Sequence, residues 1–381
     1  MDFLLSETTD YELALFIIFS LAFIIQLFYY IVIYARVPFA RSKPLNKDLE
    51  KLHPVSVVIC TRNEEENLSN FLPSILEQEY NEYEVIVVND CSEDDTDMLL
   101  QRLMEKYKHL RTTTITRDSK FTHGKKLALT VGIKAAKYNW LLLTDADCKP
   151  DSNQWLTMMA SNFNDNSELV LGYSGYIPFK GLLNRFIRFD TFFIALQYLS
   201  FALFGKPYMG VGRNLAYRKD LFIKNRGFAS HSHILSGDDD LFVHEVATKK
   251  NTVVEYRHNA HTRSLPCTSF ECWFTQKKRH LKSSPHYRFS AKLWLALEPF
   301  SRICFWGTGI AMLALEFKLY HISGVIAFRL LLMSIIIKIA MNRLSEKKIF
   351  LTSLIYDLFS PLFYFVLMLV VRFSPKRGRW K

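Results

Sequence analysis

Long apolar runs stand near both ends of the chain. Residues 13–34 contain no ionisable side chain other than tyrosine, and a run of this length can span the ~30 Å hydrocarbon core of a bilayer at ~1.5 Å per helical residue. Three more apolar stretches occupy the C-terminal third, at about 293–316, 319–340 and 350–371. The pattern predicts an N-terminal transmembrane anchor and linker at 1–52, and a C-terminal membrane region at 286–381 with two to three transmembrane segments.

The charges around these runs predict an orientation. Acidic residues precede the first run and basic residues follow it: Asp2, Glu7, Asp10 and Glu12 before, Arg36, Arg41, Lys43 and Lys47 after. The positive-inside rule then places the middle of the chain in the cytoplasm, and the basic loop at 340–348 agrees with this. The basic tail at 372–381 would face outwards after three full crossings, so we interpret the segment 291–303, which contains Pro299, as interfacial or re-entrant. We expect an integral protein of the inner or cell membrane.

Residues 53–285 have a different pattern, in which short β-branched runs alternate with helical periodicity. The runs HPVSVVIC, YEVIVVND and NWLLLTDAD predict buried strands, RTTTIT predicts another, and GKKLALTVGIKAAKY predicts a helix. Strands and helices that alternate in this way form βαβ units. We therefore expect an α/β domain with a Rossmann-like, mostly parallel sheet covered on both faces. Asn63 is expected to cap the helix after the first strand.

A further amphipathic stretch lies inside this domain. At 179–205, Arg185 and Arg188 stand among Phe and Leu residues. This arrangement predicts an interfacial helix that lies on the membrane. A fifth crossing is the alternative.

Composition narrows the class of protein. Hydrophobic residues make up 49% of the chain and charged residues 22%, which excludes a disordered protein. The net charge of +11 would suit nucleic acid, anionic lipid or a phosphorylated substrate. Because the basic residues concentrate beside the apolar runs, membrane lipid is favoured and no nucleic-acid partner is expected. The six cysteines lack zinc-ligand spacing, so reduced thiols are expected rather than a disulfide framework.

Carboxylates follow three of the predicted strands, at Glu64, Asp90, and the pair Asp145 and Asp147. The carboxyl ends of parallel strands lie at one edge of a sheet, where ligands bind in open α/β folds. On an extended segment, residues i and i+2 share a face, so Asp145 and Asp147 can share a divalent ion. Mg²⁺ or Mn²⁺ suits such oxygen ligands and would neutralise a diphosphate leaving group. No dinucleotide fingerprint or phosphate-binding P-loop motif is present.

These motifs, in this order, resemble family 2 glycosyltransferases with the GT-A fold, over about residues 54–280. VSVVICTRNEEENL resembles the opening strand of that family, VIVVNDCSEDDT its nucleotide-binding strand end, and TDADC its metal-binding pair. HGKKLALTVGI is similar to its donor-side helix, with Thr130 where Asn is usual. SGDDDLFVHEV resembles the segment that carries the catalytic base, with Gly237 in place of Glu. GVGRNLAYRKDLF resembles the loop before it, and QKKRH the Q-x-x-R-W motif, with His280 in place of Trp.

The resemblance implies a role for each matching residue. It implies donor contacts for Thr61, Asn63, Glu64, Asp90, Lys125, Asp145, Gln276 and Arg279. It implies metal binding by Asp145 and Asp147. Asp238 takes the position of the catalytic base, with Asp239 as a close competitor. Gly210, Gly212 and Arg213 are implied on the acceptor side.

We therefore expect an inverting, metal-dependent glycosyltransferase that moves a sugar from a nucleotide-sugar donor, such as a UDP-sugar, to a lipid-linked or glycan acceptor at the membrane. A separate base and no enzyme nucleophile imply single displacement. A processive polysaccharide synthase is the alternative within this class. A non-catalytic membrane scaffold that has kept the fold is the alternative outside it.

Overall fold

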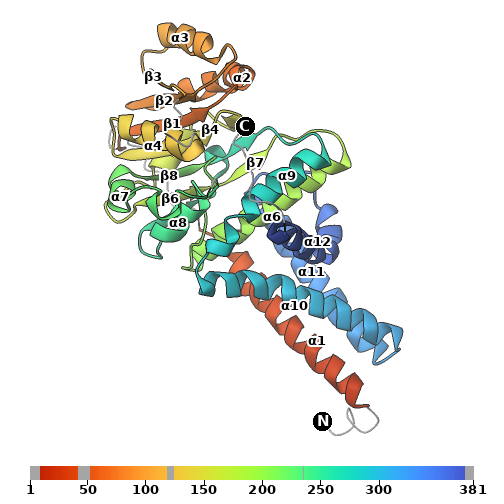
Figure 1. Cartoon of the computed structure of the whole chain (residues 1–381). Helices are drawn as coiled ribbons and strands as arrows, with labels where there is room; N and C mark the ends of the chain where they lie inside the picture. Colours follow the sequence, from red (N-terminus) through yellow and green to blue (C-terminus); the bar gives the residue numbers. More distant parts are fainter. Residues whose placement is uncertain (1–8, 42–51, 118–123, 235, 374–381) are drawn as a thin grey trace.

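The computed structural model describes residues 9–41, 52–117, 124–234 and 236–373 (Figure 1). The linker at 42–51 and the tail at 374–381 lie outside these residues, as do Asp2 and Glu7. Their part in the predicted orientation stays a prediction.

A mixed seven-stranded sheet forms the centre of the middle domain, in the order β3-β2-β1-β4-β8-β6-β9. Four neighbouring strands run parallel: β1 (Val55–Thr61), β2 (Tyr83–Asp90), β3 (Leu110–Ile115) and β4 (Trp140–Asp145). The others are β6 (Leu169–Gly172), β8 (Leu215–Arg218) and β9 (Thr252–Glu255), and β8 is antiparallel to both of its neighbours. Every residue of β1 is buried, as expected of a β-branched run between two helical layers. The predicted mostly parallel α/β sheet is confirmed.

Helices cover both faces of the sheet, because alternate side chains of a strand point to opposite sides. Val57 belongs to the hydrophobic cluster of α2 (Glu65–Leu76), and Val58 belongs to that of α4 (Lys125–Ala135). At Gly132 of α4 an added Cβ would lie 2.6 Å from Val58 Cγ1, so the close approach of α4 to β1 requires glycine. Further helices of the domain are α3 (Thr96–Lys106), α5 (Trp155–Ala160), α7 (Lys219–Lys224) and α8 (Asp240–Val246).

A small second sheet, in the order β5-β10-β7, connects the middle domain to the C-terminal helices. Its strands are β5 (Cys148–Pro150), β7 (Ser174–Tyr176) and β10 (Thr262–Ser264). Arg263 of β10 forms an ion pair with Glu346, which is buried in the loop between α11 and α12. The same carboxylate accepts hydrogen bonds from Arg188 at 2.6 Å and from the Tyr173 hydroxyl at 2.8 Å. One buried glutamate thus joins the helices to the small sheet.

The predicted apolar runs all form helices. They are α1 (Asp10–Phe28), continued to Arg36 by π- and 3₁₀-helical turns, α10 (Phe289–Ala314), α11 (Leu319–Arg343) and α12 (Thr352–Phe373). Helices α1 and α10 lie side by side and extend away from the sheet (Figure 1). Within the described residues, four helices are long and apolar enough to cross a membrane: Asp10–Arg36, α6 (Leu182–Leu203), α11 and α12. Helix α10, which contains the 291–303 segment, is not among them, and its interfacial placement stays a prediction.

Helix α6 is the stretch predicted to lie on the membrane surface. In the structure, 72% of the most apolar 18-residue stretch of this helix is buried within the protein. Its Asp190 pairs with Lys277 of α9 (Phe270–Leu281) and accepts hydrogen bonds from the hydroxyls of Tyr356 and Tyr364 of α12. Helix α6 is therefore a central packing element between the sheet and α12, whatever its position relative to the bilayer.

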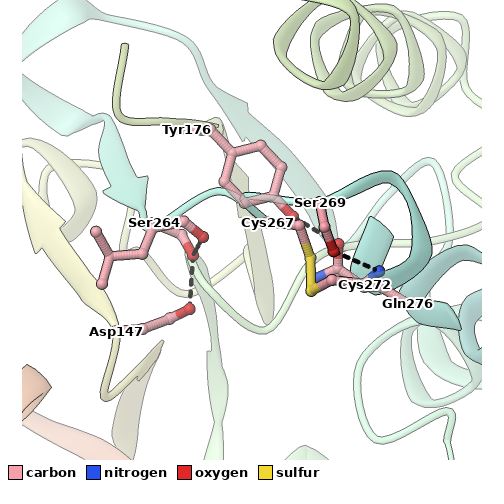
Figure 2. Close-up of a disulfide and its surroundings, with 8 residues drawn as sticks. Asp147, Tyr176, Ser264, Cys267, Ser269, Cys272 and Gln276 are labelled. Carbon is pink, nitrogen blue, oxygen red and sulfur yellow. Dashed lines mark hydrogen bonds between the residues drawn. A yellow bond between two sulfur atoms is a disulfide. The ribbon is translucent and has the colours of Figure 1, made fainter. Parts of the chain in front are cut away.

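The expectation that all cysteines are reduced is wrong for one pair. Cys267 and Cys272 form a disulfide, with their Cα atoms 5.8 Å apart (Figure 2). The chain turns back between them because Ser269 caps α9 by accepting a hydrogen bond from the Cys272 amide. Spacing alone could not reveal this turn. The other four cysteines form no disulfide.

Candidate active site

A cavity of about 570 Å³ lies where the carboxyl ends of β1 and β4 face the C-terminal helices. One half, the catalytic half, is lined by the ends of these strands, the start of α4, the turn before α8, and α9. The other half, the helical half, is lined by α6, α10 and α12. The cavity therefore continues from the edge of the sheet to helices that the sequence assigns to the membrane region.

Most of the predicted site residues meet in this cavity. Its lining includes Glu64, Lys125, Asp145, Asp147, Arg213, Asp238, Asp239, Gln276 and Arg279. Five predicted residues are not among the described lining: Thr61, Asn63, Asp90, Gly210 and Gly212. Thr61 and Asp90 are buried at the ends of β1 and β2. At Gly210 an added Cβ would lie 3.0 Å from Leu171, so packing accounts for that glycine.

Asn63 holds a loop instead of capping a helix, which corrects the capping prediction. It has a left-handed backbone conformation with φ of 55°. Its side-chain oxygen accepts a hydrogen bond from the Glu93 amide at 2.7 Å. Its own amide donates to the Ser92 hydroxyl at 2.9 Å. The residue thus fixes the loop after β2 against the end of β1, and α2 begins without a side-chain cap.

The carboxylates of Asp145 and Asp147 are suited to a divalent ion. Asp145 Oδ1 accepts from Lys125 Nζ at 2.8 Å, and Asp147 Oδ2 accepts from the Ser264 hydroxyl at 2.8 Å (Figure 2). Burial and the neighbouring Asp145 raise the pKa of Asp147, because two carboxylates repel each other in a confined space. A bound cation would relieve that repulsion, and oxygen ligands of this kind are preferred by Mg²⁺ and Mn²⁺. The donor set therefore fits the predicted metal.

Lys125 links this pair to the aspartates before α8. Its ammonium lies 2.8 Å from Asp145 and 3.2 Å from Asp238. Burial alone would lower the pKa of Lys125, but the surrounding carboxylates raise it well above its usual value. The side chain is therefore a permanent cation beside the metal pair, where it can stabilise negative charge on a departing phosphate.

The three consecutive aspartates have different partners. Asp240 accepts hydrogen bonds from the hydroxyls of Ser283 and Tyr287. Asp239 caps α8 and accepts from the Gly212 amide at 2.8 Å. Burial, and then the charges of Asp238 and Asp240, raise the pKa of Asp239 to about 7. A carboxylate with this pKa suits a general base at neutral pH, so Asp239 gains support beside the aligned Asp238. Gly212, predicted on the acceptor side, thus contributes its backbone amide as a hydrogen-bond donor to Asp239.

Helix α9 contributes the Q-x-x-R-W-like segment. Gln276 Oε1 accepts a hydrogen bond from the Tyr176 hydroxyl at 3.1 Å, and Arg279 lines the cavity (Figure 2 shows Gln276 and Tyr176). Lys277, between them, is buried against Asp190. No role was predicted for Lys277 and Asp190, or for Glu298 and Arg302 of α10, which line the helical half. Charges inside apolar segments were the available signal, since such residues are rarely placed there without a partner or a function.

A second group of metal-ligating side chains lies outside the cavity. Potential ligand atoms of Asp151, His258 and His261 lie within 4.8 Å of one another. The Asp151 carboxylate is already paired with Arg263 at 2.9 Å. Asp145 is likewise paired, with Lys125, so this contact does not separate the two groups. Asp145 and Asp147 line the cavity whereas Asp151, His258 and His261 do not, which favours the predicted pair.

Comparisons with known proteins agree with this geometry. Residues 56–226 match the family model described as glycosyl transferase family 2. Over 153 residues, the chain is 29% identical to a poly-beta-1,6-N-acetyl-D-glucosamine synthase of Staphylococcus epidermidis, which covers 40% of this chain and 35% of that protein. Over 183 residues, it is 26% identical to the synthase of the same name from Staphylococcus aureus (strain COL), covering 44% and 43%. The chain thus spans less than half the length of these curated relatives.

A solved structure has a similar fold along nearly the whole chain. The mannosyltransferase PcManGT from Pyrobaculum calidifontis, in complex with GDP-Man and Mn²⁺, superimposes with a TM-score of 0.58. The match covers 92% of this chain and 99% of that one, at 17% sequence identity. At this identity the likeness establishes the fold, including the helices that flank the sheet, and not the substrate.

Proposed function

We propose that the chain is an inverting, metal-dependent glycosyltransferase that uses a nucleotide-sugar donor and a membrane-associated acceptor, because residues 56–226 match the family model of glycosyl transferase family 2. One observation carries the proposal. A carboxylate pair suited to a divalent ion and an aspartate with a pKa of about 7 line the same cavity. Departure of a nucleoside diphosphate and removal of a proton from a hydroxyl need these two groups.

The residues of this chain divide the reaction between them. Asp239, or its neighbour Asp238, removes the proton from the acceptor hydroxyl, which then attacks the anomeric carbon. Lys125 and Arg279 stabilise charge that develops on the diphosphate. A divalent ion on Asp145 and Asp147 would add Lewis-acid stabilisation of the same leaving group. Since no enzyme nucleophile is involved, the reaction is a single displacement with inversion at the sugar.

The acceptor is proposed to reach the base from the membrane side. The cavity extends from Asp239 to α10 and α12, both of which expose large apolar side chains, among them Phe300 and Phe359. A lipid-linked acceptor held at the bilayer would enter this way. We propose a UDP-sugar as donor and a cytoplasmic catalytic domain, following the charge asymmetry beside α1.

The test is release of nucleoside diphosphate by the full chain in detergent. A panel of UDP- and GDP-sugars with total membrane lipid would be supplied with Mn²⁺, with Mg²⁺ and with EDTA. We expect release with one donor, loss of release with EDTA, and loss in Asp147→Ala. Asp165→Asn is the matched control, since its side chain is fully exposed far from these motifs in sequence. Equal release from the Asp147→Ala variant and the original chain would refute metal-dependent transfer at this site.

A processive polysaccharide synthase is the second candidate. It is favoured by the curated relatives, whose names describe synthesis of a poly-β-1,6-N-acetylglucosamine. Radiolabelled donor separates the two: a single labelled glycolipid supports one transfer per acceptor, and a ladder of increasing size supports a polymer. A scaffold that has only kept the fold predicts no release with any donor.

A further inference from the structure

The helical half of the cavity has a feature that the transfer reaction does not explain. Its lining includes charged side chains from helices that the sequence assigns to the membrane region, namely Glu298 and Arg302 of α10. Both are at least 97% buried. Buried charges in such helices need partners or a ligand. The identity of their partners therefore indicates which acceptors this half can hold.

The cation of the helical half, and the one at its boundary, are each already paired with a carboxylate. Arg302 Nη2 lies 2.6 Å from Glu298 Oε2, and Arg302 Nη1 lies 3.8 Å from Asp357. Lys277, at the boundary with the catalytic half, forms an ion pair with Asp190. Among the described lining residues of α6, α10 and α12, Arg302 is the one cation. Adding a phosphate here would place a second anion beside a balanced pair in a medium of low dielectric, which is costly.

The same region offers hydrogen bonds without net charge. The Ser360 hydroxyl accepts from Arg302 Nη1 at 3.2 Å, and the Tyr364 hydroxyl donates to Asp190. One oxygen of Glu298 and Nε of Arg302 are buried and lack a hydrogen-bond partner. A buried polar atom without a partner destabilises the protein, and a ligand hydroxyl or amide that reached it would offset this cost. This incomplete network suits a group that both donates and accepts.

The face of α12 opposite the cavity is apolar and exposed. Phe359 and Leu362 are each more than half exposed, and Phe300 of α10 is 64% exposed. Acyl chains would cover these side chains. An acceptor with a polar head in the cavity and its chains against this surface would satisfy both halves of the arrangement.

From these observations we infer that the helical half binds the head group of an uncharged, hydroxyl-bearing amphiphile, which is the acceptor, and that it selects against polyprenyl phosphates. The inference rests on the proposed function and narrows its acceptor class. Arg213 and Arg279, which line the cavity outside this half, then remain for the diphosphate of the donor.

The first experiment compares acceptors with the full chain in phosphatidylcholine nanodiscs. Labelled donor would be supplied with dioctanoylglycerol, octyl β-glucoside, farnesyl phosphate, or a soluble β-1,6-linked N-acetylglucosamine oligosaccharide. We expect at least tenfold faster labelling of a neutral amphiphile than of farnesyl phosphate. Faster labelling of farnesyl phosphate or of the oligosaccharide, or no labelling of either neutral amphiphile, overturns the inference. Donor hydrolysis, followed as nucleoside diphosphate release, reports separately on the proposed function.

Two variants test the site itself. Ser360→Phe fills the helical half, so KM for the neutral amphiphile should rise at least tenfold. Phe359→Leu, one residue away on the exposed face of α12, is the matched control and should leave KM unchanged. Glu298→Gln removes one negative charge beside Arg302, so labelling of farnesyl phosphate should increase about fivefold relative to the neutral amphiphile. An unchanged ratio in Glu298→Gln, or an unchanged KM in Ser360→Phe, contradicts the assignment.

Discussion

Replacing Asp239 by asparagine should abolish transfer and yet stabilise the fold at alkaline pH. The carboxyl of Asp239 has an ordinary pKa of 3.8, and the folded protein raises it to about 7. A carboxyl shifted in this direction destabilises the fold progressively as pH rises from 3.8 to 7, and the destabilisation is constant above that. From the two pKa values, the destabilisation is about 2 kcal/mol at pH 5 and about 4 kcal/mol at pH 8.

Asparagine removes this destabilisation but also weakens the hydrogen bonds that Asp239 accepts from the Gly212 and Asp240 amides. Their loss costs about 1–2 kcal/mol in total. The net expectation for Asp239→Asn is a stability close to that of the original chain at pH 5 and a gain of about 2–3 kcal/mol at pH 8. Transfer activity should fall by at least ~100-fold, the usual contribution of a general base.

The assay is thermal unfolding of the full chain in nanodiscs at pH 5 and pH 8, with transfer measured on the same preparations. Asp165→Asn, which removes an exposed carboxylate, is the control and should show no such dependence on pH. An Asp239→Asn variant that is less stable than the original chain by the same amount at both pH values would refute the reasoning, because the carboxyl would then only cap α8. Retained transfer would assign the base to Asp238.

Three further predictions concern packing and bonding elsewhere. Gly132→Ala should lower the free energy of unfolding by about 1–3 kcal/mol, because its Cβ would meet Val58 at 2.6 Å. Gly324→Ala, which has open space around it, is the control and should not lower it; chemical unfolding measures both variants, and an equal effect in the two would contradict the reasoning. Cys272→Ser opens the short disulfide loop that joins Cys267 to the first turn of α9, and should lower the free energy of unfolding by no more than about 2 kcal/mol. A larger loss in thermal unfolding without reductant would contradict this. Arg329→Met removes the main ion-pair partner of the buried Asp357, which keeps only the Arg302 contact at 3.8 Å and the Trp306 hydrogen bond, and should cost about 3–5 kcal/mol. Adding Asp357→Leu should recover part of this loss in the same measurement, and no recovery in the double variant would contradict the reasoning.

The sequence predicted those features that are determined by a short local run of residues, and missed those that depend on contacts between distant segments. The β-branched run at 55–61 and the apolar run at 13–34 determine a strand and a helix by themselves, so both were predicted correctly. The carboxylates of Asp145 and Asp147 were placed at the sheet edge because topology brings the ends of parallel strands together. Their side-chain partners come from distant segments and could not be inferred from spacing.

The helical half of the cavity was not predictable for the same reason. Hydrophobic periodicity indicates which face of α6 is apolar but not which element covers it, so its burial against α12 was missed. The pKa of Asp239 depends on burial and on the approach of Gly212 from another loop. The motif resemblance could therefore name Asp238 and Asp239 as competitors but could not separate them.

Glu346 gives the C-terminal apolar helices a part in the candidate active site that differs from anchoring. This carboxylate, between α11 and α12, holds Arg263 of β10, and the next residue of that strand, Ser264, holds Asp147. A displacement of the helix loop would thus be transmitted through two consecutive residues to the proposed metal ligand. A soluble fragment cut before α11 would leave Arg188 and Arg263 without their shared carboxylate. The C-terminal helices are in this sense structural members of the proposed site's framework.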